Sequence, residues 1–177
     1  MVLEAVSRMP DKRSPRALED LFRDHSELVY RTAYSIVNNV SDAEDVVQNV
    51  FLQLARRQLP PDLARNTKGY LYRAAINASL NTIRSKRRYE LVGDSEGLDG
   101  VANPPDLREN EQPHRHLAQA LAELKPEAVH ILVLRYVHGY SDAHIAKLLG
   151  TSRTVIAVRL FRSRARLKTL LRDMGEK

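Results

Sequence analysis

Apolar residues recur every three or four positions along nearly the whole chain, which is the spacing of amphipathic α-helices. The spacing predicts helices over 18–38, 41–57 and 69–89, two more between 115 and 138, and a last pair over 141–149 and 152–171. Signals for strands are scarce, because the chain has only 7 glycines and 6% aromatic residues. We therefore predict an all-α fold.

The last two predicted helices have the pattern of a helix-turn-helix. Ser141 and Ser152 stand where N-caps are expected, and Gly150 suits the left-handed turn that ends the first helix. The second helix should bury Ile156, Leu160, Ser163 and Leu167, and its remaining surface is rich in Arg and Lys. In a helix-turn-helix such a second helix enters the major groove. The alternative is an ordinary basic surface helix.

The segment 90–113 differs in composition from the rest of the chain. It is rich in Asp, Glu, Gly and Pro and cannot bury a core, so we predict a flexible acidic linker. The predicted organisation is a flexible tail (1–14), an N-terminal helical domain (15–90), the linker (91–113) and a helix-turn-helix domain (114–177). Between the second and third helices, 58–68 is predicted to be a loop.

The predicted helix 41–57 separates apolar from polar residues. Ser41 and Glu44 have the spacing of a capping box. Its apolar face contains Val40, Ala43, Val47, Val50 and Leu54, and its opposite face contains Asp42, Asp45, Gln48, Asn49 and Gln53. The acidic residues either stabilise the helix start through the helix dipole or form a surface for a basic protein partner. Periodicity alone favours the first interpretation.

The predicted helix 69–89 carries a continuous polar stripe, formed by Tyr70, Arg73, Asn77, Asn81, Arg84 and Arg88. An aromatic ring, amides and guanidinium groups in one row suit single-stranded nucleic acid, because they allow stacking, base hydrogen bonds and phosphate neutralisation. The alternative is a solvated helix face with a basic end.

Charge and composition narrow the classes of function. A net charge of +6 and a pI near 9.7 favour a polyanionic partner. The chain has no cysteine, and its six histidines do not form a metal-binding motif, so we predict no metal and no cofactor. The sequence shows neither an apolar run of membrane-spanning length nor a signal peptide, which predicts a cytoplasmic protein.

Together these features resemble the extracytoplasmic-function (ECF) sigma factors, a class of bacterial RNA polymerase specificity subunit, over residues 18–171. The segment DAEDVVQNVFLQL at 42–54 is similar to the helix with which that family binds the clamp of core RNA polymerase. The resemblance favours the second interpretation of the acidic residues in this helix, a surface for a protein partner. It implies a polymerase-binding face made by Asp42, Glu44, Asp45, Gln48 and Asn49.

The resemblance extends to both DNA-binding parts of that family. YLYRAAINASLNTIR at 70–84 is similar to the helix that captures the melted −10 strand, which implies this role for the stripe Tyr70, Arg73, Asn77, Asn81, Arg84 and Arg88. The region 121–171 resembles the −35-binding domain. It implies −35 contacts from Arg153, Thr154, Ala157, Val158, Phe161 and Arg162.

The function implied is a sigma factor that binds core RNA polymerase and directs promoter recognition, −10 melting and transcription initiation. Core polymerase and promoter DNA are the implied partners, with a possible anti-sigma factor, and no membrane insertion is expected. A stand-alone helix-turn-helix regulator would leave the acidic helix and the stripe without a role. An RNA-binding or polymerase-associated protein that does not select promoters would leave the second helix of the helix-turn-helix without a role. An enzyme is least favoured, since no nucleophile–base pair, phosphate loop or carboxylate pair is recognisable.

Overall fold

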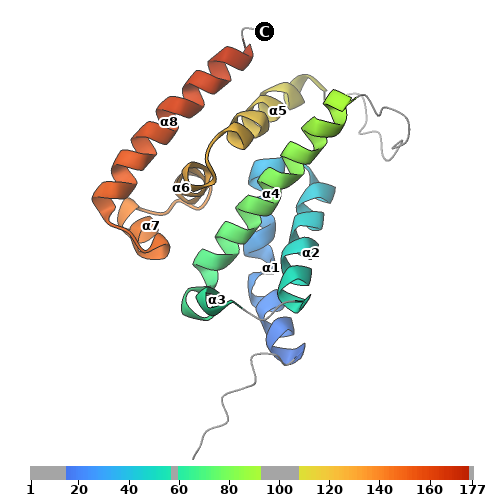
Figure 1. Cartoon of the computed structure of the whole chain (residues 1–177), viewed down its shortest axis with the longest axis vertical. Helices are drawn as coiled ribbons and strands as arrows, with labels where there is room; N and C mark the ends of the chain where they lie inside the picture. The colour runs from blue at the N-terminus through green and yellow to red at the C-terminus, as the bar shows by residue number, and fades with distance from the viewer. Residues whose placement is uncertain (1–14, 57–59, 93–107, 176–177) are drawn as a thin grey trace, which may run out of the picture.

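The computed structural model describes residues 15–56, 60–92 and 108–175, and in these ranges all regular secondary structure is helical. The predicted tail 1–14 and most of the predicted linker lie outside the described residues. The all-α prediction is confirmed. Figure 1 shows the helices, which are α1 (Pro15–Val37), α2 (Val40–Arg56), α3 (Pro61–Arg65), α4 (Thr67–Val92), α5 (Arg108–Glu123), α6 (Pro126–Tyr136), α7 (Asp142–Leu149) and α8 (Arg153–Gly175).

Helix α4 is the central element, because it lies between α1 and α2 on one side and α5 to α8 on the other (Figure 1). Leu71 and Ala75 point into a core shared with α1, α2 and α3. Tyr72 and Ile76, on a neighbouring face of α4, join a second core built mainly from α5 to α8. Two adjoining apolar faces on one helix therefore bring the N-terminal and C-terminal domains into contact.

Polar contacts reinforce this packing between the domains. The side-chain amide of Asn66 donates to the carbonyl of Leu148 at the end of α7 (2.7 Å), and its oxygen accepts from the backbone N–H of Gly69 (2.9 Å). A β-carbon at Gly69 would come within 2.5 Å of the Asn66 side chain, so this arrangement requires glycine. The hydroxyls of Tyr72 and Tyr140 lie 2.9 Å apart. Asn66 thus caps α4 and ties it to the helix-turn-helix.

The structure corrects the predicted start of α2. The helix begins at Val40, and the side chain of Asn39 accepts from the backbone N–H of Asp42 (3.0 Å). The predicted capping box of Ser41 and Glu44 is therefore wrong, because Ser41 already lies inside the first turn. Val40, predicted on the apolar face, is 54% exposed.

The predicted loop 58–68 and the predicted linker 91–113 both contain helical residues. Pro61 opens α3, where a fixed φ and a missing N–H are tolerated, and α4 begins at Thr67. At the other end, α4 continues to Val92 and α5 begins at Arg108. The glycines of 91–113 all precede 108, whereas 108–112 contains neither Gly nor Pro and can form helix.

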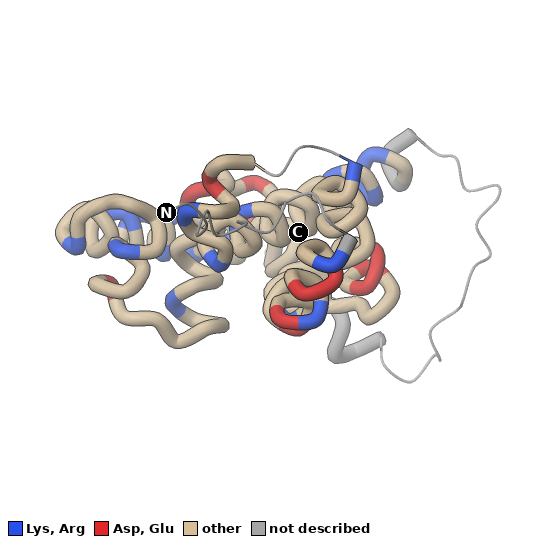
Figure 2. Tube along the Cα trace, turned by 90° about the horizontal axis from the view of Figure 1, so that it is seen from below, with Lys and Arg blue, Asp and Glu red and all other residues tan. Residues whose placement is uncertain are grey.

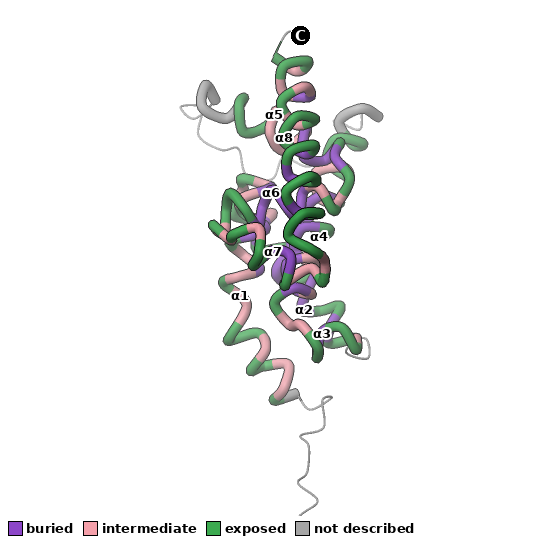
Figure 3. Tube along the Cα trace, turned by 90° about the vertical axis from the view of Figure 1, so that its left-hand side faces the viewer, coloured by how far each residue is buried: buried purple, intermediate pink, exposed green. Residues whose placement is uncertain are grey.

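The helix-turn-helix has the predicted signals. The hydroxyl of Ser141 accepts from the N–H of His144 (3.2 Å), and that of Ser152 accepts from the N–H of Val155 (3.3 Å). Gly150 has a left-handed φ of 66°. Figure 3 shows α8 with one buried side and a long exposed side, and the buried residues are Ile156, Leu160, Ser163 and Leu170, with Leu167 half-buried.

Candidate polymerase and nucleic-acid interfaces

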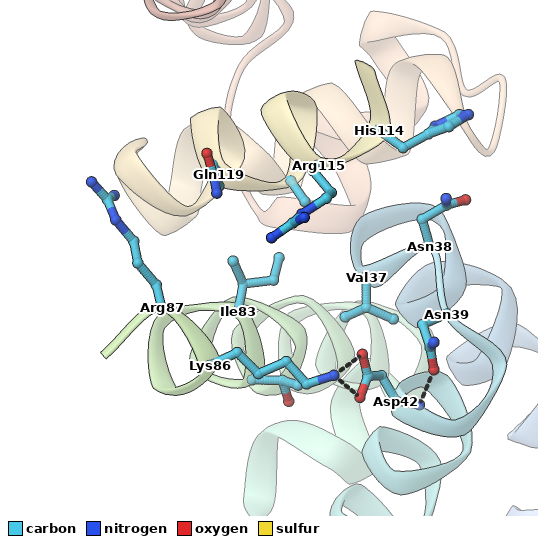
Figure 4. A pocket seen from close by; sticks show the side chains of 12 residues that line it. Val37, Asn38, Asn39, Asp42, Ile83, Lys86, Arg87, His114, Arg115 and Gln119 are labelled. Carbon is cyan, nitrogen blue, oxygen red and sulfur yellow. Dashed lines mark hydrogen bonds and ion pairs between the residues drawn. The ribbon is translucent and has the colours of Figure 1, made fainter. Parts of the chain in front are cut away.

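The outer face of α2 exposes four of the five predicted polymerase-binding residues. Glu44, Asp45, Gln48 and Asn49 are exposed, opposite the buried Val46, Val47, Val50 and Leu54. Asp42 differs, because its side chain is only 15% exposed and its carboxylate binds Lys86 of α4 at 2.6 Å (Figure 4). Asp42 therefore joins α2 to α4 and is less available to a partner than its four neighbours.

A groove of about 800 Å³ runs between α2 and α4. Four residues of the predicted stripe line it: Tyr70, Arg73, Asn77 and Asn81. Asn49 and Gln53 line the groove from the α2 side. The groove therefore brings an aromatic ring, a guanidinium group and four amides together. These are the groups that bind the bases and backbone of a single strand.

The other two residues of the stripe do not line this groove. Arg84 is half-buried, and its Nε and Nη2 donate to the backbone carbonyl of Ala122 in α5 at 3.1 and 2.8 Å. Arg88 is exposed but lies outside the groove. The prediction of one continuous stripe is wrong beyond Asn81, because contact with α5 draws Arg84 away.

Several residues of the groove are not predicted by the sequence pattern, namely Gln53, Asp62, Ser85, Lys86 and Tyr89. Tyr89 is the most exposed large apolar residue in the described parts of the chain, at 70%. Its spacing of four residues from Ser85 and eight from Asn81 would have been a signal, because such positions share a helix face. The stripe continues through Ser85 and Tyr89 rather than through Arg84 and Arg88.

The N-terminal half of α8 exposes all six predicted −35 residues, which are Arg153, Thr154, Ala157, Val158, Phe161 and Arg162. Phe161 is 67% exposed and Val158 is 44% exposed, opposite the buried Ile156 and Leu160. Arg162 also lines a groove between α8 and the start of α6, together with Lys125 and Arg159. An apolar centre with cations at its edge suits contact with bases and phosphates in a major groove.

Charge is unevenly distributed over the molecule. The end formed by α7 and α8 shows mainly Lys and Arg, whereas Asp and Glu gather on the side of α1 and α2 (Figure 2). The α7–α8 end therefore suits contact with DNA phosphates, and the α1–α2 side suits contact with a basic protein surface.

The side chains of Tyr72, which is buried, and His138, which is half-buried, lie where the domains meet. The Thr32 hydroxyl donates to the Leu28 carbonyl (2.7 Å), so it accepts from the Nε2–H of His138 (3.0 Å). Burial, aided by the charge of Arg31, lowers the pKa of His138. Burial and the hydrogen bond to Tyr140 raise the pKa of Tyr72. Both groups are therefore held neutral in the packed form.

In the described residues, no three His, Asp or Glu side chains gather as metal ligands would. No helix within these residues has the length and apolar character needed to cross a membrane.

Comparison with known proteins agrees with this geometry. Family models of sigma-70 region 2 and sigma-70 region 4 match residues 21–89 and 114–167. The ECF RNA polymerase sigma factor SigL of Mycobacterium tuberculosis is 30% identical over 88% of this chain and 89% of its own length. The chain belongs to the ECF family of RNA polymerase sigma factors.

Other ECF sigma factors are similar over most of this chain. SigE of Mycolicibacterium smegmatis is 29% identical over 91% of it, although the chain spans only 64% of the length of SigE. Among solved structures, the sigma factor RpoE in complex with the anti-sigma factor NepR from Bartonella quintana has a TM-score of 0.52 at 22% identity. That match covers 89% of this chain and 98% of RpoE, and it supports the fold.

Membership of the family assigns a role to both domains. ECF sigma factors are regulatory proteins that bind core RNA polymerase and promoter DNA to start transcription. The region 2 match covers α2 and most of α4, and the region 4 match covers the helix-turn-helix. A stand-alone regulator is not favoured, because it would leave the region 2 helices unexplained.

Proposed function

We propose that this ECF sigma factor uses three surfaces to start transcription, of which the first two adjoin at Asn49. The exposed α2 residues Glu44, Asp45, Gln48 and Asn49 bind core polymerase. The groove between α2 and α4 binds the melted −10 strand, and the exposed face of α8 reads the −35 element. The observation that carries this proposal is the convergence of Tyr70, Arg73, Asn77 and Asn81 on one groove. A duplex-binding regulator has no use for such a groove.

Each of the three surfaces has a different chemistry, suited to a different partner in transcription initiation. Acidic side chains on α2 complement a basic protein surface, whereas the cations of α8 neutralise phosphates and give the affinity for duplex DNA. Amides and an aromatic ring in the groove need unpaired bases, which exist only after the duplex opens. The groove therefore acts after α8 has engaged the promoter. We assign this chain no catalytic step and place its action in the cytoplasm, with RNA polymerase.

Regulation by an anti-sigma factor is part of the proposal. The solved structure of RpoE is described as a complex with the anti-sigma factor NepR, and its fold matches most of this chain. An anti-sigma factor that acts on this chain would have to block one of the three surfaces.

The experiment is reconstitution with bacterial core polymerase, followed by transcription from a library of promoter fragments. We expect a complex that elutes as one species and initiates from a defined subset of fragments. Asp45→Arg should weaken core binding and leave the fold intact, because Asp45 is exposed and its reversed charge meets a basic partner. Losing an interfacial charge pair weakens binding by about 2–5 kcal/mol when the pair is buried and much less at a rim. Unchanged affinity of Asp45→Arg at moderate salt would contradict the assignment of α2.

A further inference from the structure

A pocket of about 300 Å³ lies where the two domains meet, between the α1–α2 turn, α4 and α5 (Figure 4). Helix α5 contributes His114, Arg115, Ala118 and Gln119, and the rest of the lining belongs to the N-terminal domain. Neither domain forms this pocket alone. It shares only Thr82 and Lys86 with the groove between α2 and α4, so most of its lining has no role in the function proposed above.

Three cations reach the pocket from two helices. Lys86 and Arg87 come from α4 and Arg115 comes from α5, whereas Asp42 is the one acidic residue among the described residues that line it. Asp42 binds Lys86 at 2.6 Å, and Arg87 donates to Glu123, outside the lining, at 2.8 Å. Positive charge is in excess even when Glu123 is counted. The packing of α5 on α4 therefore brings cations together, and an anion between them would reduce their repulsion.

The rest of the lining indicates what kind of anion fits. Val37, Ile83 and Ala118 give the pocket an apolar part, and the side-chain amides of Asn38 and Gln119 can donate hydrogen bonds. A few polar groups beside apolar ones are typical of a site for a small organic molecule. A phosphate group has three terminal oxygens that can accept from donors on different sides, whereas a carboxylate has two oxygens in one plane. A phosphate group attached to a small carbon body therefore matches both parts of the pocket.

We propose that this pocket is a binding site for a small phosphate ester. The guanidinium groups of Arg115 and Arg87 donate to the phosphate oxygens from α5 and α4, and Lys86 adds a positive charge beside them. In Figure 4 the side chain of Arg115 extends from α5 into the space beside Ile83 and Val37, where the carbon body of the ligand lies. Because both domains supply ligand contacts, the ester binds the packed arrangement and stabilises it by mass action.

The test is isothermal titration calorimetry of the full chain with glycerol phosphate, inorganic phosphate and succinate, each at the same ionic strength. Glycerol phosphate should bind more tightly than inorganic phosphate, which cannot use the apolar part of the pocket, and more tightly than the dicarboxylate succinate. Arg115→Gln should weaken the binding of glycerol phosphate about tenfold or more, because a charged hydrogen-bond donor is lost. Arg88→Gln is the matched control, since Arg88 is an exposed arginine of α4 outside the pocket, and it should bind like the parent chain.

A second measurement tests whether the site spans both domains. Fluorescent labels on α2 and α8 report domain packing through energy transfer, which is lost when urea separates the domains. Glycerol phosphate at about 100 times its Kd should shift the packing equilibrium of the parent about 100-fold toward the packed form, and so raise the urea concentration required. Arg115→Gln should show a much smaller shift at the same concentration. Arg115 is exposed, so its replacement should preserve the fold, which circular dichroism checks.

Four results would overturn the inference. The first is no binding of glycerol phosphate to the parent up to about 10 mM. The second is equal weakening by Arg115→Gln and Arg88→Gln, which would indicate a general effect of charge, and the third is equally tight binding of succinate. The fourth is binding that leaves domain packing unchanged, because the site would then lie within one domain.

Duplex DNA is the competing partner for these cations. If Arg115→Gln keeps full affinity for glycerol phosphate but loses affinity for duplex DNA, the cations bind the DNA backbone and the inference is overturned. The measurements with glycerol phosphate need neither polymerase nor promoter, so their failure would leave the proposed function untouched.

Discussion

The contact between Arg84 and Ala122 leads to a quantitative prediction about how the two domains are held together. In a continuing helix the carbonyl of Ala122 would accept from the N–H of residue 126, but that residue is Pro126 and has no N–H. The Arg84 guanidinium supplies the missing donors, with bonds of 2.8 and 3.1 Å. Replacing Arg84 by Ala leaves this carbonyl without its partner.

The size of the effect follows from the geometry. A hydrogen bond from a charged donor contributes about 1.5–3 kcal/mol to stability. The two bonds from Arg84 share one acceptor, so their contributions are not added. Arg84 also lies beside the last turn of α5, where a cation is favoured by the helix dipole. We expect Arg84→Ala to reduce the free energy of domain packing by about 1.5–3 kcal/mol, which is on the order of 10- to 150-fold in the equilibrium constant.

The assay measures the distance between the domains as urea is added. The chain contains no cysteine, so two labels can be attached cleanly through Ala55→Cys on α2 and Ala165→Cys on α8, both exposed positions. Energy transfer between the labels should be lost at lower urea in Arg84→Ala than in the parent. Loss of helix, followed by circular dichroism, separates domain opening from unfolding.

Arg88→Ala is the matched control, since Arg88 lies one turn further along α4 and is exposed. Arg88→Ala removes the same charge and should not change the urea concentration at which half of the molecules have opened. If Arg84→Ala and Arg88→Ala open at the same urea concentration as the parent, the bond to Ala122 does not hold the domains together, and Arg84 returns to the group of candidate DNA-binding residues.

Three further predictions concern DNA and pH. Asn77→Ala should reduce promoter opening more than closed-complex binding, because a contact with an unpaired base is worth about 1–3 kcal/mol. An unchanged permanganate footprint of the melted region would indicate that Asn77 has only a structural role. Arg162→Ala should relax discrimination at one or two −35 positions on a randomised −35 library if it reads a base, whereas uniform weakening would indicate a phosphate contact. The lowered pKa of His138 implies an unfolding free energy that is greatest above pH 6.5, the ordinary pKa of histidine, and falls below it as the unfolded chain takes up the proton. His138→Gln, followed by urea titration from pH 5 to 8, should flatten this dependence by up to about 1.4 kcal/mol per pH unit, and an unaltered slope would contradict it.

Local sequence determined the helices and the helix-turn-helix. Ser141, Gly150 and Ser152 act through hydrogen bonds and backbone angles that involve only their near neighbours, so the pattern predicted them correctly. The start of α2 was missed because Asn39 and Ser41 are both good N-caps, and sequence alone could not choose between them. The face of α8 followed from periodicity, because its burial depends on a single apolar side.

The tertiary structure decided which polar residues share a surface. Tyr70, Asn77 and Asn81 are spaced as the sequence implied, but the groove that they line also needs Asn49 and Gln53 from α2. A smaller groove between α1 and α2, lined by Phe22, Tyr30 and Val47 among others, likewise depends on how two helices pack, and neither helix shows it alone.

Arg84 shows most directly why sequence was insufficient. Its spacing on α4 is compatible with the DNA-binding stripe, and nothing nearby in the sequence distinguishes it from Arg88. The sequence does show that the Ala122 carbonyl lacks a helical donor, because Pro126 follows four residues later. Which donor meets that carbonyl depends on α5 packing against α4, a contact between residues 38 positions apart. Periodicity determines the face on which a side chain lies, and only the packing of distant helices determines what that face meets.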